Sequence, residues 1–379
     1  MRILGDPQDS LRVVQVVGTN GKGTTAVALA AALEAAGAPA GAYLSPHVLS
    51  YTERVMIHGE YVPEELFAAA MDGVMRVADA NGVPASQFEV LTAGALRIFA
   101  EEGLSWAVLE AGLGARYDAT SAAGAEAVVL TNVGLDHTEY LGETVEEISL
   151  EKLASLAPGA TLILGTDDRL VVALARERSE EVGARLIEAD QEEDPTFPKL
   201  PPYAAGDARL GLRAAEVMLG RSLAAEERER AAGSIVGALP GRFEVHEVGG
   251  VPVVVDGGHN ASGIEATLEA VRSAYGERPL VVVFGALRDK DIGSMLTGLQ
   301  KEAHALLLTR PEGERAAEPA HLMREHGPRD LEGRRARVET DAIAAVEAAV
   351  EEASREGGVV LVTGSLYTAA PVVGWLREE

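Results

Sequence analysis

Residues 13–33 read VVQVVGTNGKGTTAVALAAAL, and this stretch decides the fold. A β-branched run enters a glycine-rich turn that carries one lysine, and an alanine- and leucine-rich helical pattern follows. Glycines let a backbone approach phosphate oxygens, and the N–H groups at the start of a helix attract negative charge. Lys22 adds a mobile cation, and a hydroxyl from Thr24 or Thr25 could face Mg²⁺. The stretch therefore predicts a phosphate-binding loop between a strand and a helix.

The spacing of this loop differs from the standard Walker sequence, which has a glycine about five residues before the second loop glycine and a serine or threonine after the lysine. Val16 and Gly23 occupy those positions here. A dinucleotide site is less favoured, because no G-x-G-x-x-G occurs and a lysine suits a triphosphate. The remaining alternative is a glycine-rich turn without a ligand, and the surrounding strand, hydroxyls and helix argue against it.

Strand-like and helical patterns alternate along the chain, which is typical of α/β proteins with parallel sheets. The expected strands are 13–17, 107–110, 127–131, 161–164, 253–256, 280–285, 305–308 and 359–362. The expected helices are 25–36, 64–78, 91–102, 208–219, 263–273 and 342–356. A Pro-Gly turn near 233–242 predicts a larger domain at 1–236 and a smaller one at 237–379. The acidic stretch 191–203 is predicted to be a surface loop of the first domain.

Composition restricts the classes of function. The 379 residues, enough for two or three domains, include 59 acidic and 33 basic side chains, a net charge of −26. Such a charge disfavours nucleic acid and anionic membranes as partners. The absence of cysteine excludes disulfides, thiolate catalysis and cysteine-bound metals. Neither a secretion signal nor a long uncharged apolar run is visible, so we expect a cytoplasmic protein.

Three polar clusters follow predicted strands, at the edge where open parallel sheets bind ligands. Ser45 lies in a Ser-Pro-His run, Glu110 closes an apolar strand, and His137 follows the next strand. Together their hydroxyl, carboxylate and imidazole could hold a divalent cation beside the phosphates. Each also has a purely structural alternative, as a turn serine, a salt-bridged glutamate or a hydrogen-bonded histidine. Lys152 follows on a helix, where the pattern alone predicts a solvated lysine.

The second predicted domain repeats this arrangement. Arg242 lies in ALPGRFE, and the run VVVDGGHNASG ends a strand with Asp256 and His259. An aspartate at a strand end could bind a ribose hydroxyl or a metal. Residues 284–292 and 362–369 add further polar turns after strands. We expect this edge to face a ligand and the phosphate loop of the first domain.

These motifs, taken in order, resemble the folylpolyglutamate synthase/dihydrofolate synthase branch of the Mur ligase superfamily. They are GTNGKGT (18–24), SPH (45–47), ER (53–54), FEVLTA (88–93), LEAGLGARYDAT (109–120), TNVGLDHTEYLG (131–142), EK (151–152), PGRFE (240–244), DGGHN (256–260), DKD (289–291) and TGSLY (363–367). The resemblance runs from about residue 5 to the C-terminus. It implies a P-loop ATPase domain with a parallel-sheet core, followed by a smaller Rossmann-like domain.

The resemblance also implies a reaction, in which ATP drives the ligation of L-glutamate to dihydropteroate or to the glutamate tail of a reduced folate such as tetrahydrofolate. The γ-phosphate would pass to a substrate carboxylate, and the amine of glutamate would attack the acyl phosphate. ATP and Mg²⁺ would be the cofactors, with ATP between the domains of a monomer. A ligase for another carboxylate and an inactive nucleotide-binding regulatory module are the alternatives.

Residue roles follow from the matching motifs. The expected nucleotide-binding residues are Gly18, Thr19, Asn20, Gly21, Lys22, Gly23, Thr24, Asp207, Arg242, Asp256 and His259. The expected Mg²⁺ ligands are Thr24, Ser45, Glu110, His137 and Lys152, the last as a carbamate, which reverses the expectation of a solvated lysine. Catalysis is assigned to Lys22, His137 and Lys152, and substrate contacts to Thr92, Arg116 and Tyr117.

The chain departs from the family pattern in a few places. The family usually has a longer segment before the phosphate loop, and that segment contributes to the pterin site. Ala115 replaces a glycine of the family's GLGGR, Ser121 replaces an asparagine, and Asp207 replaces an asparagine expected near the nucleotide. We expect these changes to affect acceptor and base recognition more than the ligase chemistry.

Overall fold

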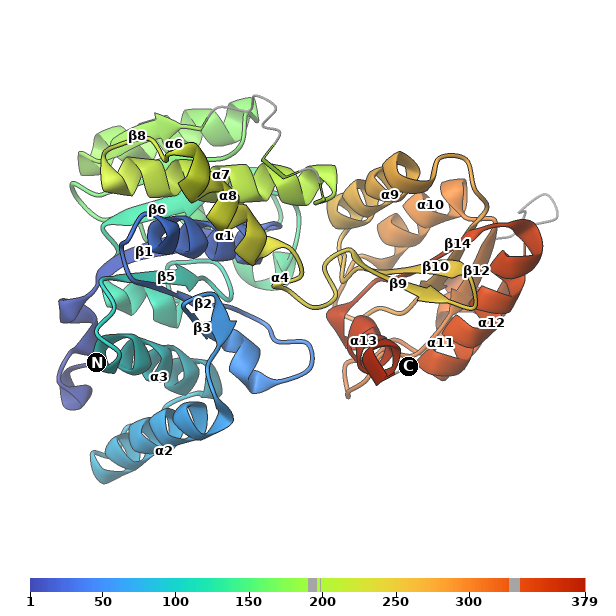
Figure 1. The fold of residues 1–379 in the computed structure, drawn as a ribbon, viewed down its shortest axis with the longest axis horizontal. Coiled ribbons are helices and arrows are strands. Elements are labelled where there is room, and N and C mark those ends of the chain that lie inside the picture. The colour runs from blue at the N-terminus through green and yellow to red at the C-terminus, as the bar shows by residue number, and fades with distance from the viewer. Residues whose placement is uncertain (190–195, 198, 327–334, 379) are drawn as a thin grey trace. The chain divides into compact units, whose positions relative to one another are not determined.

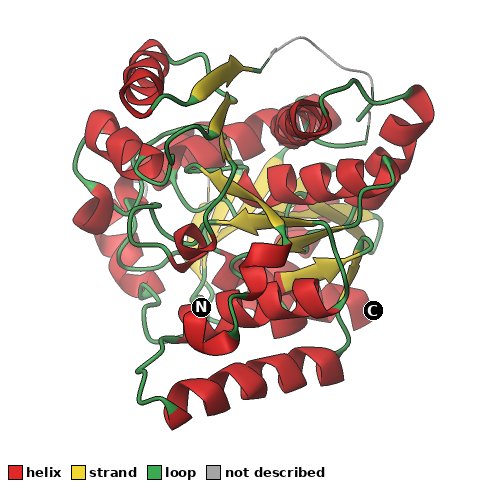
Figure 2. Ribbon diagram, turned by 90° about the vertical axis from the view of Figure 1, so that its left-hand side faces the viewer, coloured by secondary structure: helices red, strands yellow, loops and turns green. Residues whose placement is uncertain are grey.

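The computed structural model describes residues 1–189, 196–197, 199–326 and 335–378. The chain forms two compact units, Met1–Leu239 and Pro240–Glu379, whereas the pattern placed the boundary at 236 (Figure 1). Each unit is a sheet of mostly parallel strands between helices, and Figure 2 shows strands inside and helices outside. The predicted α/β fold class is therefore confirmed.

The sheet of the first unit has the strand order β4-β3-β2-β5-β1-β6-β7-β8. Its strands are β1 (Arg12–Val17), β2 (Ala40–Tyr43), β3 (Val55–Ile57), β4 (Glu60–Tyr61), β5 (Trp106–Glu110), β6 (Ala127–Leu130), β7 (Thr161–Leu164) and β8 (Arg185–Glu188). Neighbouring strands are parallel except β3, which is antiparallel to both β2 and β4. Since β1 pairs with β5 and β6, the loop after β1 emerges between the ends of two other strands.

Helices cover both faces of this sheet. They are α1 (Lys22–Ala35), α2 (Glu64–Ala80), α3 (Gln87–Glu101), α4 (Thr138–Leu141), α5 (Val145–Leu153), α6 (Arg169–Val182), α7 (Pro202–Leu219) and α8 (Ala225–Ile235). Helices α1, α7 and α8 share one apolar cluster with the sheet, and α2 and α3 share another. Alanines make α1 apolar on nearly every side, which suits a helix enclosed by a sheet and two other helices.

The second unit has the strand order β13-β12-β11-β14-β10-β9, in which only β9 is antiparallel to its neighbour. The strands are β9 (Glu244–Val248), β10 (Val251–Val255), β11 (Leu280–Phe284), β12 (Ala305–Leu308), β13 (Arg335–Val338) and β14 (Val359–Thr363). The helices are α9 (Ala261–Tyr275), α10 (Ile292–Glu302), α11 (Pro319–His326), α12 (Ala342–Glu356) and α13 (Leu366–Glu378). Helices α9, α10 and α11 share one apolar cluster with the sheet, and α12 and α13 share the other.

Every strand predicted from the pattern forms, and the strands that the pattern missed lie mostly at sheet edges. The prediction of a surface loop at 191–203 holds in part: residues 196–197 and 199–201 form neither helix nor strand, and all of them except Phe197 are at least partly exposed. Phe197 is buried in the cluster under α1 and α7, and α7 already begins at Pro202, because proline suits the first turn of a helix. Residues 191–195 and 198 lie outside the described residues. In the described ranges, each helix is too short or too polar to cross a lipid bilayer.

Candidate functional site

The phosphate loop, residues 18–21, joins the buried strand β1 to α1. At two positions of this loop, both the backbone conformation and the lack of space for a side chain require glycine. Gly18 and Gly21 have φ angles of 154° and 80°, where side chains are strained. A Cβ added to Gly18 would lie 1.8 Å from Thr131 Oγ1, and one on Gly21 would lie 2.1 Å from Asp207 Oδ1. The tight loop predicted from the sequence is present, and Asp207 of α7 lies against it.

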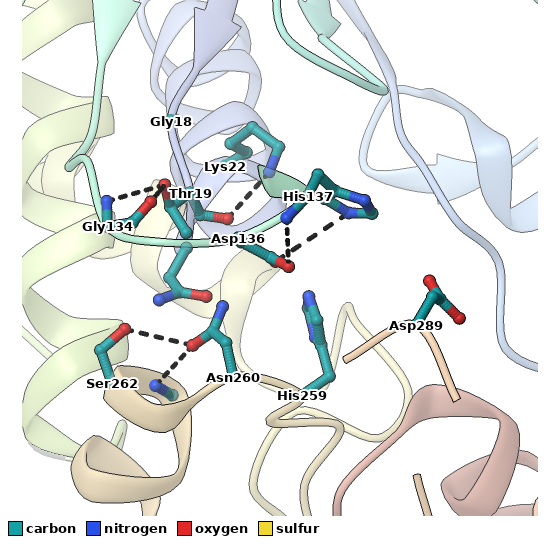
Figure 3. A network of polar contacts seen from close by, with 12 residues as sticks. Gly18, Thr19, Lys22, Gly134, Asp136, His137, His259, Asn260, Ser262 and Asp289 are labelled. Atoms are coloured by element: carbon teal, nitrogen blue, oxygen red, sulfur yellow. Dashed lines mark hydrogen bonds and ion pairs between the residues drawn. The ribbon is translucent and has the colours of Figure 1, made fainter. Parts of the chain in front are cut away.

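The loop that follows β6 holds the phosphate loop in place. Asn132 accepts a hydrogen bond from the N–H of Asn20 (3.0 Å) and donates one to its carbonyl (3.1 Å). Thr131 Oγ1 donates to the same carbonyl (2.7 Å), and the N–H of Gly134 donates to Thr19 Oγ1 (2.9 Å; Figure 3). Sequence reasoning did not assign these bracing residues, although they lie in the TNVG run directly after a predicted strand. They shape the phosphate loop before any ligand binds.

The cation and hydroxyls of the loop have distinct positions. Lys22 Nζ donates to the carbonyl of Thr19 at 3.0 Å (Figure 3). Thr25 is fully buried, and its hydroxyl donates to the carbonyl of Asp207. Thr24 is only half-buried. Of the two threonines, Thr24 therefore has the more accessible hydroxyl, and its contact with a metal stays a prediction.

The first two polar clusters meet at the start of α1. Glu110 is 5% exposed, and its Oε2 accepts a hydrogen bond from the N–H of Ser45 at 2.8 Å. A Cβ added to Gly23 would lie 3.4 Å from the same oxygen. Among the described residues, histidines and acids form no ready metal cluster of three. One carboxylate beside a phosphate loop nevertheless fits Mg²⁺, which takes few protein ligands and completes its shell with phosphates and water.

The third cluster contributes a histidine and a neighbouring acid. His137 has a left-handed backbone (φ 51°), and its N–H donates to Asp136 Oδ1 at 2.9 Å. Its ring Nε2 lies 3.9 Å from Asp136 Oδ2 (Figure 3). Asp136 was not assigned from the sequence, although its position beside a candidate metal ligand is the signal that could have found it. This carboxylate holds the backbone of His137 and lies near its ring.

Lys152 is not the solvated lysine that the helical pattern predicted. Its side chain is 4% exposed on the inner face of α5, and Nζ donates to the carbonyl of Gly18 at 2.7 Å. Burial, and after it the charge of Lys22, lowers the pKa of Lys152 from 10.5 to about 7, and the charges of Asp136 and Glu151 oppose the shift. Near neutral pH, this environment leaves a substantial fraction of the side chain as the uncharged amine, the form that can react with carbon dioxide.

The residues predicted to contact substrate differ in accessibility. Tyr117 is 91% exposed, and half-exposed Arg116 is bonded to Glu151. Thr92 is 2% exposed, and its hydroxyl donates to the carbonyl of Phe88 within α3. Thr92 is enclosed by the apolar side of α3 that packs on the sheet, and its expected substrate contact stays a prediction.

In the second unit, Asp256 shapes the turns around it. It is 4% exposed, and its carboxylate accepts hydrogen bonds from the N–H groups of Phe243 and Gly258 and from the hydroxyl of Thr267. One of these donors lies beside Arg242 in the turn before β9. These bonds use both oxygens of Asp256 to hold two turns, and the nucleotide contact expected for Asp256 from the sequence stays a prediction.

The turn after β10 contains His259 and Asn260. The ring Nδ1 of His259 lies 3.1 Å from the carbonyl of Gly257, and a carbonyl only accepts, so Nδ1 carries the proton. Asn260 caps α9 by accepting from the N–H of Gly263 and the hydroxyl of Ser262 (Figure 3). The cap fixes the backbone of the turn between β10 and α9.

Comparison with known proteins identifies both units. Residues 16–195 match the Mur ligase middle domain, and residues 241–366 match the Mur ligase, glutamate ligase domain. The dihydrofolate synthase/folylpolyglutamate synthase of Escherichia coli K12 is 32% identical over 95% of this chain and 86% of its own length. A probable bifunctional folylpolyglutamate synthase/dihydropteroate synthase of Haloferax volcanii is 34% identical over 99% of this chain. The chain spans about half of that protein (47%).

Solved structures agree with this assignment. The folylpolyglutamate synthase of Mycobacterium tuberculosis complexed with ADP superposes with a TM-score of 0.90 at 26% identity, covering 100% of this chain and 93% of that one. The bifunctional folylpolyglutamate synthase/dihydrofolate synthase with Mn, AMPPNP and L-glutamate bound has a TM-score of 0.82 at 28% identity, covering 99% and 92%. The same two-unit architecture therefore occurs in proteins that bind a nucleotide and a divalent metal.

Proposed function

Because the chain belongs to the folylpolyglutamate synthase/dihydrofolate synthase family of Mur ligases, we propose that it ligates L-glutamate to dihydropteroate and to the glutamate tail of reduced folates at the expense of ATP. The acceptor carboxylate attacks the γ-phosphorus, which releases ADP and forms an acyl phosphate. The amine of L-glutamate then attacks the acyl carbon, an amide forms, and phosphate and a proton leave. The observation that supports this most is the carboxylate of Glu110 beside the glycine-rich start of α1.

The phosphate loop has a defined task in this reaction. Its N–H groups and Lys22 bind the phosphates and neutralise the charge that develops during transfer. Bound Mg²⁺ supplies further charge neutralisation, with Thr24, Ser45, Glu110 and His137 as its ligands. Gly18, Thr19, Asn20, Gly21 and Gly23 provide the close backbone approach.

We assign Lys152, as a carbamate, to the binding of a second metal ion. Its neutral amine adds to carbon dioxide and releases one proton, which converts a cation into an anion that can bind a metal. The buried position and the lowered pKa support this assignment, because only an uncharged amine has the electron pair that forms the new bond. The carbamate nitrogen keeps one N–H, so the hydrogen bond to Gly18 is compatible with the modification.

The remaining roles concern the nucleotide and the acceptor. Asp207 lies against the phosphate loop and is assigned to the nucleotide, as are Arg242 and His259, whose turns Asp256 holds. Exposed Tyr117 offers an aromatic surface to the acceptor. We further propose that the protein is a cytoplasmic monomer.

An acceptor panel tests the proposed function. Purified protein receives ATP, Mg²⁺ and L-glutamate with dihydropteroate, tetrahydrofolate or a cell-wall precursor carboxylate, and ADP release and product mass are measured. We expect glutamate addition to the first two, dependence on the divalent ion, and loss of turnover in Lys22→Ala with the fold preserved. Turnover only with the cell-wall precursor would favour the other ligase class. ATP binding without turnover would favour the regulatory module.

A further inference from the structure

Arg116 is held by both oxygens of one carboxylate. Its backbone N–H donates to Glu151 Oε1 at 3.1 Å, and its side-chain Nε donates to Glu151 Oε2 at 3.0 Å. The side chain of Glu151 is 20% exposed, and that of Arg116 is 49% exposed. A two-point attachment at the backbone and at Nε fixes the near edge of the guanidinium and leaves its far edge toward solvent.

The loop that carries Arg116 is fixed at other points as well. Buried Asp118 accepts hydrogen bonds from the N–H groups of Gly112 and Leu113, both at 2.9 Å. A Cβ added to Gly114 would lie 2.9 Å from Leu141 and 3.0 Å from Glu151 Oε1, so the loop packs directly on α4 and α5. The loop begins at Glu110, the carboxylate beside the phosphate loop.

Helix α5 ties this loop to the phosphate loop. Glu151 holds Arg116, and the next residue, Lys152, donates to the carbonyl of Gly18. Adjacent residues of one helix therefore set the positions of both loops. A group bound by Arg116 is placed at a defined distance from the phosphates.

The far edge of Arg116 is available for a ligand. Within the residues that the structure describes, its two terminal amino groups make no hydrogen bond. Other basic side chains of this edge already donate inside the protein, namely Lys22 to Thr19, Lys152 to Gly18 and Arg54 to His47. Two parallel N–H groups match the two oxygens of a carboxylate, which a lysine cannot do.

We propose that Arg116, oriented by Glu151, binds the acceptor carboxylate that does not react. The inference rests on the proposed function. A reduced folate ends in glutamate and has two carboxylates, of which one becomes the acyl phosphate, whereas dihydropteroate has only the reacting one. In a chain of net charge −26, the second carboxylate needs a cation of its own. Arg116 is thus a specificity residue that favours folates, and Glu151 is its positioning residue.

Steady-state kinetics with both acceptors test this role. We compare kcat/KM for tetrahydrofolate and for dihydropteroate in the wild type, Arg116→Ala, Arg116→Lys and Glu151→Gln. Arg116→Ala should lower the tetrahydrofolate-to-dihydropteroate ratio about tenfold or more, mainly through KM for the folate, because a charged hydrogen-bonded pair is lost. Arg116→Lys should recover only part of the ratio. Arg176→Ala, at the exposed Arg176–Glu188 pair, is the matched control and should leave the ratio unchanged.

A folate analogue separates binding from structure. When the non-reacting carboxylate of tetrahydrofolate is replaced by a carboxamide, kcat/KM of the wild-type protein should fall by the same factor as in Arg116→Ala. The kcat/KM of Arg116→Ala should fall no further with this analogue. Glu151→Gln should give an intermediate loss that does not add to that of Arg116→Ala. A constant ratio in Arg116→Ala, or losses that add, would overturn this inference alone. Absence of wild-type turnover with either acceptor would overturn the proposed function as well.

Discussion

Among single residues, Gly21 gives the sharpest test of the phosphate loop. Gly21→Ala combines a strained positive φ with a collision against Asp207, so we expect about tenfold or greater loss of ATP affinity and a loss of about 1–2 kcal/mol in unfolding free energy. Isothermal titration and urea unfolding measure the two effects. Gly159→Ala is the control, because Gly159 has a similar φ of 75° with open space around it. Equal behaviour of the two variants would contradict the role of the contact.

Lys152 makes the stability of the protein depend on pH. Its folded pKa, about 7, is below its ordinary value of 10.5, so between these values the unfolded chain binds a proton that the folded chain does not. The free energy of unfolding therefore rises with pH in this window, by at most about 1.4 kcal/mol per pH unit. Below about pH 7 Lys152 is protonated in both the folded and the unfolded chain, so the full cost of burying its charge destabilises the folded state.

Lys152→Met removes this titration. The difference in unfolding free energy between the wild type and the variant should grow in favour of the wild type from about pH 7 to about pH 9. Urea unfolding in buffers free of carbon dioxide measures it without carbamate formation. A difference that stays constant over this range would show that Lys152 titrates as an exposed lysine does.

Among the elements, the connection from α7 to α8 depends on one buried carboxylate. Glu216 is 7% exposed and accepts hydrogen bonds from the N–H of Leu223 and from the side chains of Arg213 and Arg228. Glu216→Ala should lower the unfolding free energy by about 2 kcal/mol, because the buried N–H of Leu223 loses its acceptor and two partly exposed arginines lose their ion-pair partner. Chemical denaturation measures the loss. Glu226→Ala removes the same charge from an exposed position of α8 and should have little effect, and similar losses in both would contradict the prediction.

For the whole molecule, the acidic surface predicts stabilisation by salt. A net charge of −26 repels itself, and the screening length falls from about 10 Å at 0.1 M to about 3 Å at 1 M salt. Raising KCl over this range should raise the Tm by about 3 °C or more, measured by calorimetry. Nearer the sequence pI of 4.7 the same salt step should have a smaller effect. A Tm that falls with KCl at neutral pH would refute this account.

Much of the fold and part of the candidate site could be predicted from the amino-acid sequence. The run from Val13 to Leu33 specifies a buried strand, a tight glycine loop and a buried helix, because β-branched, glycine and alanine preferences act between near neighbours. Alternating patterns located the central strands of both sheets for the same reason. Glu110 and His137 could be proposed as ligands, since the ends of parallel strands meet at one edge.

Only the tertiary structure determines the properties that depend on contacts between distant segments. The burial of Lys152, the enclosure of Thr92, the contact of Asp207 with Gly21 and the attachment of Arg116 to Glu151 have no signature in local sequence. Each arises where packed elements exclude water, so that the free energy of a charge or hydroxyl is set by its neighbours in space. The residue types determine which reactions are possible, and the packing of the folded chain determines which side chains remain accessible to carry them out.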